Sequence, residues 1–266
     1  MPATRDLVRQ IAVISAFCFM IIAAMVGTGL FGGTPVQDLQ EGALDADGSY
    51  LAPARPAFSI WTVIYVGLFA YTVWQAFPAQ RGRDRQRALG WLIAGTMVLN
   101  GLWLVTAQFA TLPLTVLAII VLLVLLGVTF RRAVVLPGRG IVDAMLIDGV
   151  TGLHLGWVAL ATVANTAAWL TRVVPESWGE AATTWGIAVL IVVALIGVAI
   201  AWASGWRIAP GLAMAWGLTW VGVGRLAFEP ANAAIGITAF VAAGVVLLVP
   251  LVGMVLRWSD EVRNAE

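Results

Sequence analysis

The sequence predicts an all-α integral membrane protein, a bundle of about eight transmembrane helices with both termini in the cytoplasm. Three observations support this fold class. Apolar residues make up 61% of the 266-residue chain and charged residues only 11%, whereas about a quarter of a soluble domain is charged. The apolar residues form segments close to the length of about 20 residues that crosses a bilayer. The arginines cluster between alternate segments. This composition excludes a soluble enzyme.

The expected membrane spans follow from these apolar segments. The first resembles a signal peptide at its start, but its apolar run continues from Ile11 to about Phe31 without a clear A-x-A site, so we expect an uncleaved span. The third and fourth are joined only by residues 111–113, which predicts a tight helical hairpin. The seventh is short and rich in glycine and tryptophan. The spans lie near residues 10–32, 57–78, 88–110, 113–130, 142–171, 183–204, 209–225 and 232–256.

The orientation is predicted from the basic residues, all 15 of which are arginine. Positive charge gathers in short cytoplasmic loops. With eight spans, only Arg55, Arg172 and Arg225 fall on the non-cytoplasmic side. The other 12 fall on the cytoplasmic side: Arg5, Arg9, Arg81, Arg83, Arg85, Arg87, Arg131, Arg132, Arg139, Arg207, Arg257 and Arg263. We therefore expect a multi-pass protein of the plasma membrane, and the absence of lysine suggests a GC-rich bacterial genome.

The sequence also limits the chemistry that we expect. The net charge of +1 predicts no nucleic-acid partner, and the single cysteine excludes an intramolecular disulfide. No metal-ligand cluster, paired carboxylates at i, i+4 or phosphate-binding glycine loop is visible. We therefore expect no required cofactor and no enzyme, although one histidine does not strictly exclude a nucleophilic triad.

Polar and aromatic residues inside the expected spans are the candidate functional residues, because such groups usually face the interior of a membrane bundle. They concentrate on the second, third and fifth spans. The fifth span has a stripe at i, i+3, i+4, i+7 and i+11, which places its members on one helix face. The candidates are Trp61, Tyr65, Asn100, Trp103 and the stripe His154, Trp157, Val158, Ala161 and Asn165.

Two interpretations of this concentration stay open. One is a ligand cavity with aromatic walls and a few hydrogen-bonding groups. The other is interhelical hydrogen bonding, in which Asn100, His154 and Asn165 stabilise the bundle. Asp148 lies about 240° from His154 on the helix, so the two do not share a face. The spacing of Gly152 and Gly156 predicts a close approach to another helix.

Three motifs resemble the TspO/MBR family, the tryptophan-rich sensory proteins related to the translocator protein. Pro56-x-Phe58-x-Ile60-Trp61-Thr62-x-x-Tyr65-x-Gly67 is similar to that family's second-helix signature. Leu99-Asn100-x-x-Trp103 is similar to its third-helix motif, and Gly156-Trp157-x-x-x-Ala161-Thr162-x-x-Asn165 to its fifth-helix motif. The resemblance covers about residues 10–172. The chain departs from the family in its first loop, where Pro-Ala-Arg-Pro replaces a more aromatic segment, and in its three additional spans.

The resemblance implies a five-helix bundle over residues 1–172, followed by an additional three-helix segment over 173–266. It implies a sensor or transporter that binds a planar hydrophobic ligand, such as haem or a porphyrin, or a sterol-like molecule, in a pocket under the first loop. It also makes a homodimer reasonable. The implied ligand-binding residues are Trp61, Tyr65, Asn100, Trp103, His154, Trp157 and Asn165, with Arg55 at the outer mouth to pair with a propionate.

Other functions remain as alternatives. A proton-coupled transporter of another small molecule would use Asp148 and His154, the ionisable groups available inside the membrane. A structural or regulatory membrane protein would bind no ligand and would show a tight bundle without an open cavity. Porphyrin-degrading activity, which has been claimed for the resembled family, is the one enzymatic alternative.

Overall fold

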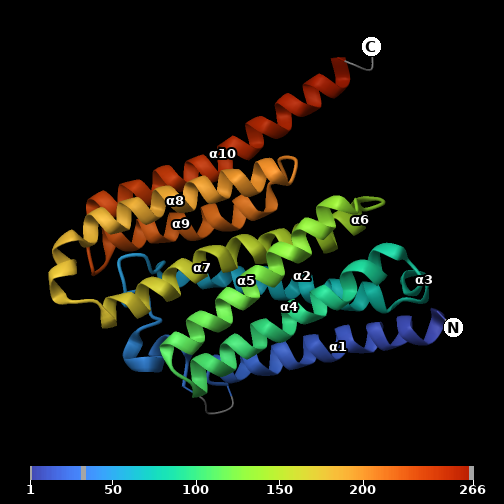
Figure 1. Ribbon diagram of the computed structural model, residues 1–266, viewed down its shortest axis with the longest axis horizontal. Coiled ribbons are helices and arrows are strands. Elements are labelled where there is room, and N and C mark those ends of the chain that lie inside the picture. Colours follow the sequence, from blue (N-terminus) through green and yellow to red (C-terminus); the bar gives the residue numbers. More distant parts are fainter. Residues whose placement is uncertain (1, 31–33, 264–266) are drawn as a thin grey trace.

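The computed structural model describes residues 2–30 and 34–263, which form helices and no strand. Figure 1 shows the long helices running back and forth along the longest axis of the molecule. Both termini lie at the end that also carries the short helices α3 (Pro78–Arg81) and α6 (Ile141–Asp143). The long helices are α1 (Pro2–Gly27), α2 (Ile60–Ala76), α4 (Asp84–Phe109), α5 (Leu112–Val135), α7 (Val150–Val173), α8 (Ala182–Ala203), α9 (Ala209–Ala227) and α10 (Ala233–Arg263).

Short helical segments connect these long helices. The segment between α1 and α2, called the first outer segment after its predicted side, contains the 3₁₀ helices η1 (Val36–Gly42) and η2 (Arg55–Ser59), and η4 (Glu176–Ala181) precedes α8. The hairpin expected at residues 111–113 is confirmed, because α4 ends at Phe109 and α5 begins at Leu112. Pro113 lies in the first turn of α5, where its missing N–H would have had no helical partner.

The all-α membrane fold is confirmed, with one difference in the number of apolar spans. Seven helices of the described residues are long and apolar enough to cross a membrane. The segment expected at 209–225 forms the eighth long helix, α9, but it falls outside that group. Many α9 residues are buried, and α9 lies against α7 and α10. A helix sheltered by protein on these sides needs less apolar surface than one surrounded by lipid.

Some helix boundaries differ from the expected ones. The first span was expected at 10–32, but α1 ends at Gly27 and a turn follows to residue 30, while residues 31–33 lie outside the described part of the chain. The fifth span was expected at 142–171. Its helix runs continuously over 141–173 and contains the π-helical segment η3 (Ala144–Gly149). Hydrophobic periodicity does not reveal such a π segment, because it changes the hydrogen-bond register over only about one turn.

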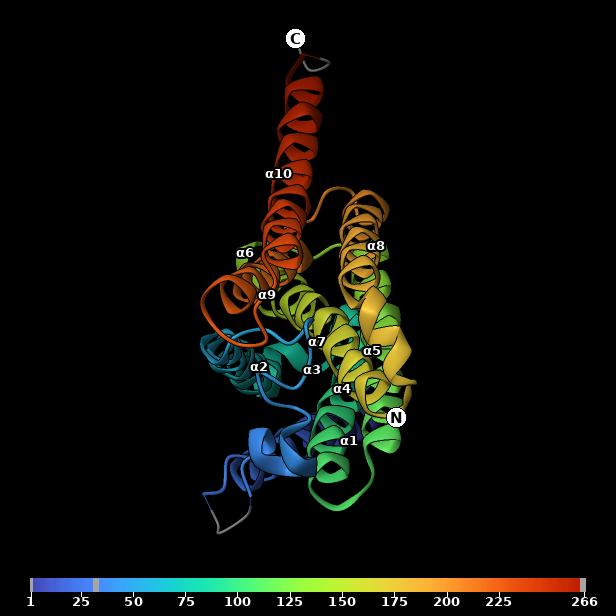
Figure 2. The same cartoon turned by 90° about the vertical axis from the view of Figure 1, so that its left-hand side faces the viewer.

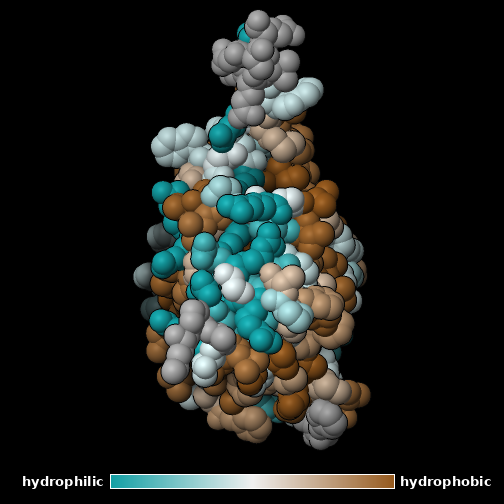
Figure 3. Space-filling model, turned by 90° about the vertical axis from the view of Figure 1, so that its right-hand side faces the viewer, coloured by the Kyte–Doolittle hydropathy of each residue, from teal (hydrophilic) through white to brown (hydrophobic). Residues whose placement is uncertain are grey.

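The two ends of the bundle differ in character. Figure 3 views the end with α3 and α6 and shows hydrophilic residues gathered at its centre with apolar surface around them. Figure 2 views the opposite end, where the segment between α1 and α2 crosses from α1 towards α9. The alternating helices therefore place the N-terminus, α3, α6 and the C-terminus together, as the arginine pattern predicts. That this end faces the cytoplasm stays a prediction.

Small residues allow α9 to pack directly on α7. A Cβ atom at Gly156 would lie 2.1 Å from the Pro210 carbonyl oxygen, and one at Gly152 would lie 2.7 Å from the Ala209 Cβ. The close approach expected from this glycine pair is confirmed, and its partner is the start of α9. The division into residues 1–172 and 173–266 stays a prediction, but this contact joins the two parts closely.

Candidate functional site

A chain of hydrogen bonds joins α2, α4 and α7 in the middle of the bundle. The Tyr65 hydroxyl donates to Asn100 Oδ1 over 3.2 Å. Asn100 Nδ2 lies 3.2 Å from His154 Nε2, which accepts this bond when the ring proton is on Nδ1. Asn100 is fully buried and His154 is 1% exposed. Three residues that were selected from the sequence thus form one network between the helices.

Aromatic side chains lie beside this network. The Trp61 ring is 5.2 Å from the Tyr65 ring, 5.8 Å from the His154 ring and 6.1 Å from the Trp157 ring, measured between centroids. Phe58, at the end of η2, meets Trp157 edge to face at 5.8 Å. These separations lie within the range in which aromatic pairs attract one another.

A second hydrogen bond lies closer to the outer end. Trp103 Nε1 donates to Asn165 Oδ1 over 3.2 Å, and Asn165 Nδ2 donates to the Ala161 carbonyl one turn earlier over 2.8 Å. Trp157 Nε1 is buried and has no partner among the described residues. An indole N–H normally finds an acceptor when it is buried. Trp157 therefore offers a donor that the protein itself does not use.

A small cavity lies under the first outer segment. Its walls include Trp61, Trp103, Trp157 and Asn165 from the helices. Residues between α1 and α2 form the outer wall, here called the roof: Val36, Ala43, Leu44, Asp45, Ala52 and Pro53. The cavity volume is about 40 Å³, which holds a few water molecules. Tyr65, Asn100 and His154 do not line this cavity.

Arg55 lies at the outer mouth but is already paired. Its Nε and Nη2 atoms donate to the two carboxylate oxygens of Asp45 over 3.0 Å and 2.6 Å. The Asp45 carboxylate also accepts the Ala46 N–H over 2.7 Å. The hydrogen bond from Arg55 holds the pKa of Asp45 below its ordinary value near 3.8. A ligand carboxylate would have to compete with Asp45 for Arg55.

Helix α9 holds the roof from the other side. Arg225 is 1% exposed, and its guanidinium donates to the carbonyls of Ser49 over 2.9 Å and Ala46 over 3.0 Å. Trp216 Nε1 donates to the Ala57 carbonyl over 2.8 Å. These contacts are not predicted from the sequence, in which no residue of α9 is a candidate for the site. The available signal is an arginine at the end of the expected span 209–225, on the side that carries few other arginines.

Asp148 belongs to a different network at the arginine-rich end. Its carboxylate pairs with Arg85 over 2.6 Å and also with Arg207, which lies between α8 and α9. Arg85 also pairs with Asp143 over 3.2 Å. Among the described residues, no hydrogen bond or ion pair joins this network to His154. Asp148 and His154 therefore occupy separate environments, as the helix-face argument predicts.

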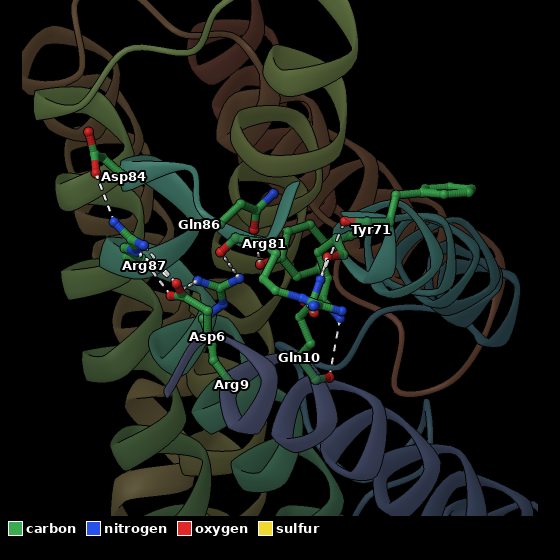
Figure 4. Close-up of polar contacts among 10 residues, drawn as sticks. Asp6, Arg9, Gln10, Tyr71, Arg81, Asp84, Gln86 and Arg87 are labelled. Carbon is green, nitrogen blue, oxygen red and sulfur yellow. Dashed lines mark hydrogen bonds and ion pairs between the residues drawn. The ribbon is translucent and has the colours of Figure 1, made fainter. Parts of the chain in front are cut away.

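The same end contains a further polar network between α1, α2, α3 and α4, shown in Figure 4. Asp6 accepts from Arg87 over 2.7 Å and from Arg9 over 3.3 Å. Tyr71 donates to Gln86 over 3.0 Å, and the labelled side chains point toward one another between the helices. This network joins the helices where they meet the hydrophilic end of the bundle.

The fold and the site together define a class, a polytopic helical membrane protein with an aromatic site beneath an outer roof. The family model described as TSPO-like protein matches residues 10–252. The chain belongs to the TSPO-like protein family. The match includes α8, α9 and most of α10, the helices that the motif resemblance over residues 10–172 does not cover. Comparisons with curated proteins and with solved structures give no match.

Proposed function

We propose that this protein binds a planar hydrophobic ligand of the tetrapyrrole type, haem or a porphyrin, between its outer roof and the tryptophans of α2, α4 and α7. It would act as a membrane sensor or transporter. The observation that carries this proposal is the convergence of Trp61, Trp103 and Trp157 on one cavity. Indole rings supply large flat contact areas, and the indole N–H of Trp157 has no hydrogen-bond partner among the described residues.

Binding of such a ligand requires the roof to move. Small-molecule sites typically have volumes of about 300–1,000 Å³, whereas this cavity has about 40 Å³. Hydrogen bonds and ion pairs hold the roof to the helices, among them the Asp45–Arg55 pair and the bonds from Arg225, and these would have to break or shift. Loops that close over a ligand commonly move in this way. The described conformation is therefore the closed form of the proposed site.

The test is a titration of detergent-solubilised protein with haem and with protoporphyrin, followed by the absorbance of the tetrapyrrole. We expect saturable binding that weakens by about tenfold or more in Trp61→Ala and in Trp157→Ala, because base-sized aromatic stacking is worth about 1–3 kcal/mol per ring. Trp202→Ala is the matched control, since Trp202 is on α8 and 72% exposed. Equal affinity in all three variants would reject the site.

A second candidate function follows from the small cavity itself. A bundle that stays closed would be a structural or regulatory membrane protein without a ligand, and the volume of about 40 Å³ favours it over an open pocket. Failure of both tetrapyrroles to bind, together with an intact fold, would support this candidate.

Proton-coupled transport has less support, because Asp148 is held by Arg85 and Arg207. Uptake that ignores a pH gradient and survives Asp148→Asn would exclude it.

A further inference from the structure

A long apolar groove lies on the opposite side of α7 from the roof network, between α5, α7 and α8. Its volume is about 530 Å³, within the range of about 300–1,000 Å³ for ligand sites. Its lining includes Leu123, Gly127 and Val134 on α5 and Ile196 and Ile200 on α8. The groove exists because the close backbone approaches of α8 are to α10 and α9 rather than to α5.

The length of the groove matches one leaflet of a bilayer. Along α5 its lining extends from Leu123 to Val134, which is about 16 Å at about 1.5 Å per residue. Half of a hydrocarbon core of about 30 Å is about 15 Å. The apolar lining therefore suits an acyl chain that enters from a single leaflet, on the arginine-rich side.

Positive charge lies at the end of the groove where a lipid headgroup would be. Arg131 lines the groove and donates one hydrogen bond, from Nη1 to the Ala203 carbonyl of α8 over 3.3 Å. A guanidinium has five N–H groups, so several remain for another acceptor. Arg132 is exposed beside it and lines an adjoining groove that shares Gly127 and Arg131. Neither lining contains a carboxylate.

We propose that this groove binds an anionic glycerophospholipid, with one acyl chain between α5, α7 and α8 and the phosphate beside Arg131 and Arg132. Basic pockets between transmembrane helices are suited to anionic headgroups, and guanidinium groups bind phosphate oxygens with two parallel hydrogen bonds. This site is separate from the proposed tetrapyrrole site, and neither proposal depends on the other.

The experiment is native mass spectrometry of the full chain, released from detergent after titration with phosphatidylglycerol or with phosphatidylcholine of the same acyl chains. We expect one retained lipid and a preference for phosphatidylglycerol. In the double variant Arg131→Gln/Arg132→Gln the preference should fall by roughly 30-fold, the scale for two arginines near a lipid surface. The matched control is Arg139→Gln, an exposed arginine at the same end outside both linings.

A second variant tests the groove itself. A Cβ atom at Gly127 meets no atom within 4 Å, and Gly127 lines the groove, so Gly127→Phe places a ring at the groove without a clash at its Cβ. We expect it to abolish retention of both lipids. Gly244→Phe on α10 is its control, because Gly244 has equally open surroundings and does not line the groove. Equal binding of the two lipids by the unmodified protein would overturn the proposal. Equal lipid retention in Gly127→Phe and Gly244→Phe would also overturn it. If Gly127→Phe changed only the dimer content, the groove would instead be a contact between two copies of the chain, and the proposal would fall.

Discussion

At the scale of single residues, Asn100 is a polar side chain in the middle of the bundle that needs hydrogen-bond partners from other helices. It is fully buried, and both ends of its amide are used, one by the Tyr65 hydroxyl and the other by His154. The core of a membrane contains no water to pair with a polar group, so a buried polar side chain is stable there only if the protein supplies its hydrogen bonds. The ligand-cavity interpretation and the interhelical hydrogen-bond interpretation are therefore compatible. The network that stabilises the helices also fixes the aromatic rings beside the cavity.

A double-mutant cycle on Asn100 and Tyr65 tests the energetic part of this argument. Asn100→Leu leaves the Tyr65 hydroxyl without its acceptor, and we expect a loss of about 1–3 kcal/mol in the free energy of unfolding. Tyr65→Phe should cost less, about 0.5–1.5 kcal/mol. Unfolding in mixed detergent micelles measures both. Because each change breaks the same bond, the double variant should lose less than the sum, whereas additive losses would mean that the bond contributes nothing.

The residues of the site divide according to how the sequence encodes them. Trp61, Tyr65, Asn100 and Trp103 lie on helices, where a period of 3.6 residues fixes which side chains share a face, so their convergence could be expected. Whether they bind a ligand stays a prediction. The contact of Arg225 with Ser49 joins residues 176 positions apart. The period of a helix does not predict which loop residues it contacts. The contact between Arg225 and Ser49 therefore could not be predicted from the sequence.

At the scale of elements, the roof is a long irregular segment fixed at a few points. Arg225 holds its middle through two backbone carbonyls, and Trp220 of the same helix accepts a hydrogen bond from the Ala54 N–H over 3.1 Å. Arg172 at the end of α7 binds Glu41 over 3.1 Å. Helices α7 and α9 thus each hold part of the roof, which gives α9 a position at the site.

The Asp45–Arg55 pair should make the roof sensitive to acid. The pKa of Asp45 is lowered in the folded protein, so the pair stabilises the fold above the ordinary carboxyl pKa near 3.8 and loses this effect as the pH falls through the lowered value. We expect Asp45→Asn to reduce the melting temperature slightly at pH 7, because 61% of the Arg55 side chain is exposed and solvent weakens the pair.

At pH 3 the same comparison should give a smaller difference, because pH 3 lies below the ordinary carboxyl pKa near 3.8, so the unfolded chain already gains a proton at Asp45 that the folded pair disfavours. Scanning calorimetry or dye-based melting in detergent at both pH values provides the measurement. Asp38→Asn is the control, since Asp38 lies in the same outer segment and forms no ion pair with another described residue. A difference for Asp45→Asn that grows on acidification would contradict the assigned role of the pair.

At the scale of the whole molecule, α9 decides how the chain crosses the membrane. In the described part of the chain, seven helices are apolar enough to span on their own, and seven crossings would put the two termini on opposite sides. The structure instead places both termini at one end (Figure 1). Helix α9 has 19 residues, about 28 Å at about 1.5 Å per residue, close to the hydrocarbon thickness of about 30 Å. Its burial between α7 and α10 removes the need for a strongly apolar surface.

Cysteine labelling in intact cells tests this crossing and the predicted orientation together. The single native cysteine is removed by Cys18→Ser, and one new cysteine is then introduced by Arg139→Cys or by Ala231→Cys, both at exposed positions. If α9 crosses and the arginine-rich end is cytoplasmic, a membrane-impermeant maleimide should label position 231 in intact cells and position 139 only after permeabilisation. If α9 stays on the cytoplasmic side, neither position should react before permeabilisation. Labelling of position 139 alone in intact cells would mean that the protein has the opposite orientation to the predicted one. The arginine-rich end would then face outward, against the charge rule.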